Sequence, residues 1–240
     1  MSKLYFSYAA MNAGKSTVLL QASWNYQERG MHTLLFTSSL YAKADDGRIT
    51  SRIGINASAK LYNEADDLYA WIAREHKKKT VNSVFVDEAQ FLTKAQVWQL
   101  ARIADRLSIP VLCYGLRTDF RGELFTGSAE LLAIADSLRE IRTICHCGRK
   151  ATMVVRQSTD GRALTSGDQV GIEKSMYVSL CRGHWEEETG RWPIAKPAAK
   201  LKAAKPKAKS LKKTRARTRT RPALRVAAAS MSSPPKRAKR

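Results

Sequence analysis

The sequence has no run of 18 consecutive apolar residues, only four cysteines in 240 residues, and no acidic side chain in residues 193–240. A membrane-spanning helix needs an apolar run of about that length, so no membrane span is expected. So few cysteines in a chain of this length do not suggest a secreted disulfide scaffold. The short apolar run near the N-terminus leads into a glycine-containing loop and not into a signal-peptide cleavage site, so we expect a cytoplasmic protein.

Charge is divided unevenly along the chain. The formal net charge is +21, but residues 193–240 hold 17 Lys and Arg residues, which leaves 25 basic and 21 acidic residues in residues 1–192. The first 192 residues are therefore expected to form a near-neutral globular core with a small extra module. The basic remainder, rich in Lys, Arg, Ala and Pro, is expected to be disordered and to bind nucleic acid without sequence preference. A solubilising tail without a partner is the alternative.

Apolar runs typical of buried strands alternate with helical patterns in the first part of the chain. The expected strands cover residues 3–8, 32–38, 83–90 and 109–115, and the expected helices cover 14–30, 65–79 and 93–107. The polar stretch 39–60 is expected to be irregular. This alternation is typical of an α/β fold with a parallel sheet covered on both faces. From residue 141 onward, short β-like runs between turns indicate a second, small module.

A phosphate-binding loop is expected in "SYAAMNAGKST" (7–17), between the first strand and the first helix. Gly14, Lys15 and Ser16 match the end of the pattern G-x-x-x-x-G-K-[ST], in which the lysine reaches the phosphates and the hydroxyl binds Mg²⁺. The first glycine of the pattern is replaced by Ala9, which matters only if that position needs a positive φ. A plain helix start is the alternative, but the strand–loop–helix context favours an anion site.

Two adjacent carboxylates lie at the end of the third expected strand, in "VFVDEAQF" (84–91). Asp87 is expected to hold the Mg²⁺ of a bound triphosphate, directly or through water. Glu88 is then free to take a proton from an attacking hydroxyl group. A capping cluster for the helix that begins near Thr93 is an alternative interpretation, and it is compatible with the first.

Four residues of zinc-binding type come in two groups, Cys145-x-Cys147 and Cys181-x-x-His184. Zn²⁺ is held by four such N and S ligands arranged tetrahedrally. A closed Cys3His set leaves no open coordination position, so a structural Zn²⁺ is expected. His146 is a competing ligand, but its side chain is expected to point away from an ion held by both flanking cysteines.

The predicted architecture is thus α/β, with a P-loop parallel sheet flanked by helices, a small C-terminal zinc-ribbon-like module and a disordered basic tail. The corresponding domains are a P-loop nucleotide-binding domain over residues 1–140, a zinc-binding and nucleoside-closing module over 141–192, and the tail over 193–240.

These motifs, in one order with "VLCYGLRTDFRGELF" (111–125), resemble those of the type II thymidine kinase family in bacteria. The resemblance extends from about residue 3 to residue 188. It implies transfer of the γ-phosphoryl group of ATP, with Mg²⁺, to the 5′-hydroxyl of thymidine. It also implies a homotetramer that is inhibited by thymidine triphosphate. In the bacterial members of this family, the loop position of Ala9 is not reliably glycine.

The resemblance also implies the site residues, with Glu88 as general base. The implied ATP site consists of Ala9, Ala10, Met11, Asn12, Ala13, Gly14, Lys15, Ser16, Asp87, Glu88, Ala89 and Gln90. The implied thymidine pocket consists of Met11, Phe91, Leu116, Phe120, Tyr177 and Val170. Arg52 matches an arginine that contacts the transferred phosphate, with a solvated surface arginine as the alternative. The stretch "QVGIEKSMY" (169–177) departs from the family because it lacks the usual Gly-Gly pair.

Two other classes of function compete with this one. "DEAQ" (87–90) resembles the acidic box of helicases, and together with the basic tail it suggests a nucleic-acid-stimulated ATPase. A helicase motor normally needs two α/β domains, however, and 192 residues hold only one. A non-catalytic nucleic-acid-binding protein would have no use for Lys15, Ser16, Asp87 and Glu88. Comparing ATP turnover with thymidine alone and with DNA alone would separate these classes.

Overall fold

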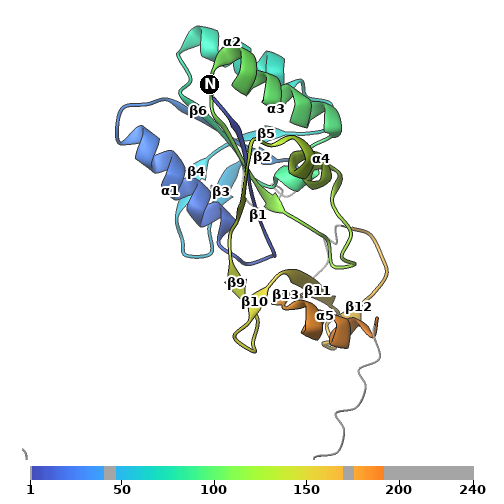
Figure 1. The fold of residues 1–240 in the computed structure, drawn as a ribbon. Coiled ribbons are helices and arrows are strands. Elements are labelled where there is room, and N and C mark those ends of the chain that lie inside the picture. Colours follow the sequence, from blue (N-terminus) through green and yellow to red (C-terminus); the bar gives the residue numbers. More distant parts are fainter. Residues whose placement is uncertain (1, 41–46, 170–175, 192–240) are drawn as a thin grey trace, which may run out of the picture. The chain divides into compact units, whose positions relative to one another are not determined.

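The computed structural model describes residues 2–40, 47–169 and 176–191. Its main feature is a six-stranded sheet with the strand order β5-β2-β6-β7-β1-β8, in which every neighbouring pair is parallel (Figure 1). The strands are β1 (Leu4–Ala9), β2 (Thr33–Ser38), β5 (Lys60–Tyr62), β6 (Ser83–Val86), β7 (Val111–Leu116) and β8 (Ser137–Glu140). The predicted α/β fold with a parallel sheet is confirmed.

Helices cover both faces of this sheet because its strands are apolar on both sides. In β2, Leu34 and Phe36 pack into a core that includes residues of α2 (Leu68–Lys78), α3 (Lys94–Leu107) and α4 (Thr126–Ile134). Leu35, between them, packs into a second core with Leu19 of α1 (Lys15–Gln27). Within the described ranges, no helix has both the length and the apolar character needed to cross a membrane.

The helix α3 begins with a capping box formed by Thr93, which directly precedes the helix, and Gln96 in its first turn. The Thr93 hydroxyl accepts a hydrogen bond from the backbone N–H of Gln96 at 3.2 Å, and the Gln96 side chain accepts one from the Thr93 backbone at 3.0 Å. These bonds satisfy N–H groups that a helix start otherwise leaves unpaired. The capping interpretation of Asp87 and Glu88 is therefore wrong, and both carboxylates are left for another role.

Some expected boundaries differ from the structure. The stretch 39–60, expected to be irregular, contains the antiparallel pair β3 (Arg48–Thr50) and β4 (Asn56–Ser58), and β5 begins at its end. Three-residue strands are too short to show a period, so the sequence pattern misses them. The strand expected to reach residue 90 ends at Val86, because Glu88 has φ 52° and begins a 3-10 helix over Ala89–Phe91. Residues 41–46 lie outside the described ranges.

Small antiparallel elements and a helix follow the main sheet. They are β9 (Thr143–Ile144), β10 (Lys150–Ala151), β11 (Met153–Gln157), β12 (Ala163–Leu164), β13 (Met176–Leu180) and α5 (Arg182–Thr189). The strands pair as β10-β9 and as β12-β11-β13. Trp185, Val155 and Leu180 pack with two cysteines into a separate small core. The division of the chain at residues 140 and 192 remains a prediction, and residues 193–240 lie outside the described ranges.

Candidate active site

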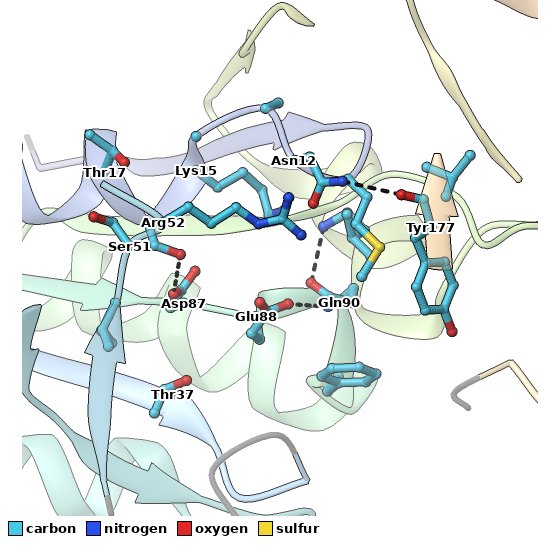
Figure 2. A pocket seen from close by; sticks show the side chains of 18 of the residues that line it. Asn12, Lys15, Thr17, Thr37, Ser51, Arg52, Asp87, Glu88, Gln90 and Tyr177 are labelled. Atoms are coloured by element: carbon cyan, nitrogen blue, oxygen red, sulfur yellow. Dashed lines mark hydrogen bonds between the residues drawn. The ribbon is translucent and has the colours of Figure 1, made fainter. Parts of the chain in front are cut away.

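A cavity of about 400 Å³ lies at the carboxyl ends of several strands of the parallel sheet. In an open α/β sheet, this edge is where ligands bind. The phosphate loop after β1, the two carboxylates after β6 and the end of β7 all line it, and β13 contributes from the second module (Figure 2). The cavity therefore combines a phosphate-type loop, acidic groups and apolar side chains in one space.

Most of the expected site residues meet at this cavity. Those that line it are Met11, Asn12, Ala13, Gly14, Lys15, Ser16, Arg52, Asp87, Glu88, Gln90, Phe91, Leu116, Phe120 and Tyr177. Ala9, Ala10 and Ala89 do not line it and are buried. Val170 lies outside the described residues. Arg52 is exposed and also lines the cavity, and its side chain extends into the same space as Lys15 (Figure 2).

The backbone of the phosphate loop explains why Ala9 is tolerated. Ala9 is the last residue of β1, paired in extended conformation with Leu116. The left-handed conformations of the loop fall on Asn12 (φ 61°) and Gly14 (φ 81°). Because position 9 needs no positive φ, a methyl group there causes no backbone strain. The glycine that the loop geometry requires is Gly14.

The start of α1 provides donors for an anion. Gly14 precedes the helix without a side-chain cap, so the N–H groups of the first turn have no partner within the helix. Gly14, Lys15, Ser16 and Thr17 all line the cavity, and the side chain of Lys15 is buried. A helix N-terminus with free N–H groups and a nearby lysine suits the phosphates of a nucleotide.

Asp87 is a buried carboxylate with one free oxygen. Its Oδ2 accepts a hydrogen bond from Ser16 Oγ at 2.9 Å, while its Oδ1 is buried without a hydrogen-bond partner. Burial, and next the charge of Glu88, raise the pKa of Asp87 to about 7, against the opposing effects of Lys15 and Ser16. Mg²⁺ prefers carboxylate and hydroxyl oxygens, so Asp87 and Ser16 fit a site for the Mg²⁺ of a bound nucleotide.

Glu88 is held in an unusual backbone conformation at the edge of the cavity. Its φ of 52° lies in the left-handed region, which is uncommon for residues other than glycine. The hydroxyl of the buried Tyr62 donates a hydrogen bond to the Glu88 carbonyl at 3.0 Å. Strained residues of this kind occur preferentially at functional sites, where the surrounding structure holds them.

Apolar side chains line the part of the cavity near the second module. Phe91 packs edge-on against Phe125, with ring centroids 5.9 Å apart. The phosphate loop is tied to β13 here, because Asn12 Nδ2 donates to the Tyr177 carbonyl at 3.2 Å and Ser179 Oγ donates to a loop carbonyl. Aromatic and aliphatic faces of this kind can enclose a flat base, while backbone groups can bind its polar edge.

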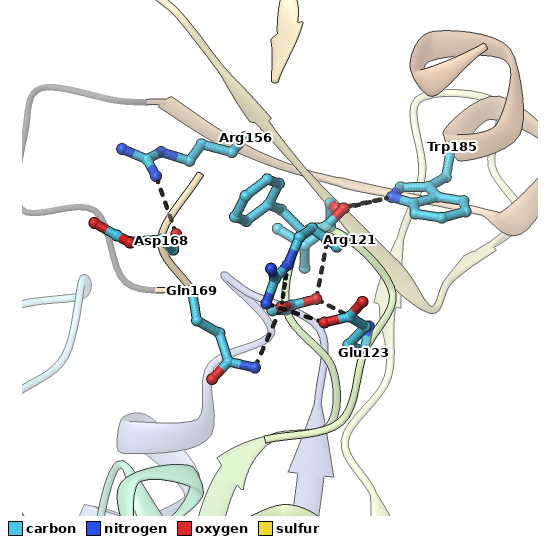
Figure 3. Close-up of polar contacts among 9 residues, drawn as sticks. Arg121, Glu123, Arg156, Asp168, Gln169 and Trp185 are labelled. Atoms are coloured by element: carbon cyan, nitrogen blue, oxygen red, sulfur yellow. Dashed lines mark hydrogen bonds and ion pairs between the residues drawn. The ribbon is translucent and has the colours of Figure 1, made fainter. Parts of the chain in front are cut away.

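A polar network fixes the loop after β7 and joins it to the second module (Figure 3). The buried Asp119 accepts hydrogen bonds from two backbone N–H groups of this loop, and Arg121 Nε lies 3.0 Å from its Oδ2. Gln169 Nε2 donates to the same Oδ2 at 3.2 Å. Trp185 Nε1 donates to the Phe120 carbonyl at 3.1 Å. The position of Phe120 in the cavity therefore depends on the second module.

The sequence did not indicate several residues that line the cavity. These are Thr17, Thr37, Arg48, Ile49, Thr50, Ser51, Ile53, Thr118, Asp119, Phe125, Val154 and Gln169. Five of them belong to the stretch expected to be irregular, which contains no recognisable motif. Asp119 carried the clearest signal, as an acid three residues after the end of the buried strand β7.

The four predicted zinc ligands form a cluster in which all ligand atoms lie within 4.8 Å of one another. Cys147 Sγ and Cys181 Sγ are 3.8 Å apart, and His184 Nδ1 lies 3.2 Å from Cys145 Sγ. Tetrahedral Zn–S bonds of about 2.3 Å place two sulfur ligands about 3.8 Å apart, so the geometry fits zinc. His146 is not a member of the cluster and stacks on the His184 ring, with centroids 4.2 Å apart.

The thiolate form needed for metal binding is favoured at Cys145. Burial opposes its ionisation, but the backbone N–H groups of residues 147 and 181 and the imidazole of His184 lower the pKa of the Cys145 thiol to about 5. A zinc ion binds the thiolate and not the thiol. With four ligands, the cluster is of the closed type found in structural zinc sites.

Comparison with known proteins assigns this combination of features to one family. The sequence model of the thymidine kinase family matches residues 2–185. A thymidine kinase from Mesorhizobium japonicum is 65% identical over 80% of this chain and 94% of its own length, and one from Photobacterium profundum is 54% identical over 80% of this chain and 100% of its own length. The structure of the Pif1 helicase from Candida albicans matches 58% of this chain and 36% of its own chain, with 14% sequence identity and a TM-score of 0.36. This TM-score is too low for the match to bear on function. The chain belongs to the thymidine kinase family.

Proposed function

We propose that this protein transfers the γ-phosphoryl group of ATP to the 5′-hydroxyl of thymidine, giving thymidine monophosphate and ADP. The observation that carries the proposal is the shared cavity, in which the phosphate loop and both carboxylates meet an apolar pocket. The names of the relatives support the same nucleoside. Phosphoryl transfer requires mainly positioning and charge neutralisation, and the residues of the cavity suit both tasks.

On the phosphate side, the N–H groups of the loop and the Lys15 ammonium would neutralise the triphosphate. Asp87 and Ser16 would hold the Mg²⁺ that accompanies ATP, and the ion would supply further positive charge at the β- and γ-oxygens. Arg52, which reaches the cavity from the turn between β3 and β4, would contact the transferred group.

On the nucleoside side, Glu88 would orient the 5′-hydroxyl and take its proton as the new P–O bond forms. General-base catalysis of this kind contributes about 10²–10⁴-fold to the rate. The apolar residues of the pocket would hold the base of thymidine. They are Met11, Phe91, Leu116, Phe120 and Tyr177.

Purified protein with MgATP and a panel of nucleosides tests this activity directly. We expect phosphorylation of thymidine well above that of purine nucleosides, and no ATP turnover with DNA alone. ATP turnover that depends on DNA and not on thymidine would favour the nucleic-acid-stimulated ATPase and would refute the proposal. Size-exclusion chromatography with light scattering tests the homotetramer that we also propose from the family resemblance.

We propose a second, separate function for residues 193–240, which is non-specific binding of nucleic acid. The observation that favours it is the charge: 17 basic residues occur there with no acidic residue to compensate them. Such a charge density attracts the phosphate backbone and releases its counterions. The family match ends at residue 185, so this segment is not part of the kinase match.

A further inference from the structure

Gln90 connects Glu88 to the end of strand β7 through both ends of its side-chain amide. Its Nε2 donates a hydrogen bond to Glu88 Oε2 at 2.5 Å. Its Oε1 accepts a hydrogen bond from the backbone N–H of Leu116 at 3.0 Å (Figure 2). The residue is only 2% exposed, so neither bond is replaced by water at low cost.

The direction of this amide is determined by the backbone. An amide side chain has one accepting end and one donating end. Turning Gln90 around would place its NH2 group against the Leu116 N–H and its carbonyl against the Glu88 carboxylate, and both contacts would be repulsive. The Leu116 N–H is always a donor, so the donating end of Gln90 is directed at Glu88.

The packing around Gln90 leaves it little room to move away. A Cβ atom at Gly115 would lie 3.0 Å from both the backbone N and the Oε1 of Gln90, closer than most real Cβ contacts. Only glycine at position 115 leaves the glutamine its present place. Strand β7 therefore packs against the Gln90 amide at Gly115, and Glu88, at the other end of the amide, lines the cavity.

We propose that Gln90 is a positioning residue that orients the Glu88 carboxylate toward the substrate hydroxyl. The proposal rests on the proposed role of Glu88 as general base. The family resemblance implies that Gln90 belongs to the ATP site, but its side-chain amide is engaged with Glu88 and Leu116. Through Leu116, which also lines the cavity, the same amide ties the carboxylate to the proposed thymidine pocket.

Two substitutions separate the two ends of the amide. Gln90→Glu keeps an acceptor for the Leu116 N–H but places a second carboxyl group against Glu88. Gln90→Met has a similar length and removes both hydrogen bonds. We expect kcat to fall about 10- to 100-fold in both variants, because a hydrogen bond to a charged group is lost. The KM for ATP should stay within about threefold in both, and the KM for thymidine should rise only in Gln90→Met.

A double-mutant cycle distinguishes positioning from a general structural role. In a Glu88→Gln background, Gln90→Met should change kcat by less than about threefold, because no carboxylate remains to be oriented. Gln99→Met is the matched control, since the Gln99 side chain also accepts a backbone N–H, that of Leu68 at 2.9 Å, and lies outside the cavity. It should leave kcat unchanged.

Three results would overturn the proposal. The first is a kcat within about threefold of wild type in both Gln90 variants. The second is a double mutant whose loss of kcat is the product of the losses in Glu88→Gln and Gln90→Met. The third is a loss of kcat in Gln99→Met as large as that in Gln90→Met. If the Gln90 variants do not fold, Gly115→Ala displaces the same amide from behind and should lower kcat without raising the KM for ATP; an unchanged kcat would again overturn the proposal. The proposed role of Glu88 as general base fails separately, if Glu88→Gln alone keeps wild-type turnover, and the proposed function fails if the wild-type protein does not phosphorylate thymidine.

Discussion

Glu88 is the residue whose chemistry the proposed mechanism depends on most. Glu88→Gln keeps the shape and reach of the side chain but removes its basicity. We expect kcat to fall about 10²–10⁴-fold, with binding of ATP and thymidine retained, because only proton removal in the transition state is lost. Steady-state kinetics and calorimetric titration measure the two effects. The exposed Glu28 provides the control substitution Glu28→Gln, and turnover of Glu88→Gln within about threefold of wild type would contradict the assignment.

Asp87 should make the stability of the ligand-free protein depend on pH. Its pKa is raised by burial from an ordinary 3.8 to about 7, so the folded state binds a proton more tightly than the unfolded state does. A raised pKa stabilises the folded state below the unfolded pKa, and this contribution is lost as pH rises through about 7. The carboxylate should therefore destabilise the free enzyme at pH 8, by on the order of 2–4 kcal/mol.

Asp87→Asn removes this titration and tests its direction. The variant should melt at a higher temperature than wild type at pH 8, and the difference should shrink toward pH 5. Binding of MgATP should be weaker at both values, because the amide is a poor ligand for Mg²⁺. Thermal melts without ligand provide the measurement, and Asp105→Asn on the exposed side of α3 is the control. A difference in melting temperature that grows toward pH 5 would contradict the predicted direction of the pH dependence.

Among the elements, β13 joins the metal cluster to the proposed substrate pocket. Its Tyr177 lines the cavity, the Ser179 hydroxyl donates a hydrogen bond to a carbonyl of the phosphate loop, and the strand ends directly before Cys181. Loosening the metal cluster should therefore affect the pocket, although the proposed zinc takes no part in the chemistry.

Substitution of a zinc ligand tests this link. Cys181→Ser should remove the single bound Zn²⁺, lower the melting temperature and raise the KM for thymidine, since structural zinc contributes directly to the folding free energy. Metal analysis of the purified chain should show one zinc in wild type. Cys113→Ala is the matched control, because Cys113 is buried in the main core and is not a member of the Cys/His cluster, so zinc should be retained. Less than one zinc per fully active wild-type chain would refute the structural site.

At the scale of the whole molecule, residues 193–240 should be dispensable for the kinase reaction. The relative from Photobacterium profundum is matched over its whole length by 80% of this chain. A protein ending near Trp192 should phosphorylate thymidine at the wild-type rate.

The same truncation should abolish nucleic-acid binding at low salt. For the full chain, log K should fall with log salt concentration at about −0.9 per phosphate neutralised. Residues 193–240 contain no aromatic side chain to stack on bases, so single strands should have no large advantage over duplexes. Fluorescence anisotropy on both proteins measures this. Equal DNA binding by the two proteins, or loss of phosphorylation in a folded truncated protein, would contradict these expectations.

Local patterns in the sequence were enough to predict four of the six strands of the central sheet, the loop before α1, the carboxylate pair after β6 and the Cys/His cluster, but not β5, β8 or α4. Each depends on residues close together in the chain: an apolar run, a glycine before a lysine, or two ligands in one turn. Among the zinc ligands, each pair is local in the sequence, and the fold brings the two pairs together across 34 to 39 positions.

The tertiary structure decided which residues share the cavity and how Glu88 is held. Tyr62 contacts Glu88 across 26 positions, Leu116 fixes Gln90 across 26 positions, and Asp119 contacts Gln169 across 50 positions. The tertiary structure also shows why alanine is tolerated at position 9, because the left-handed residues of the loop are Asn12 and Gly14. Contacts of this kind arise when strands and loops far apart in the chain pack together, and a local pattern carries no record of them.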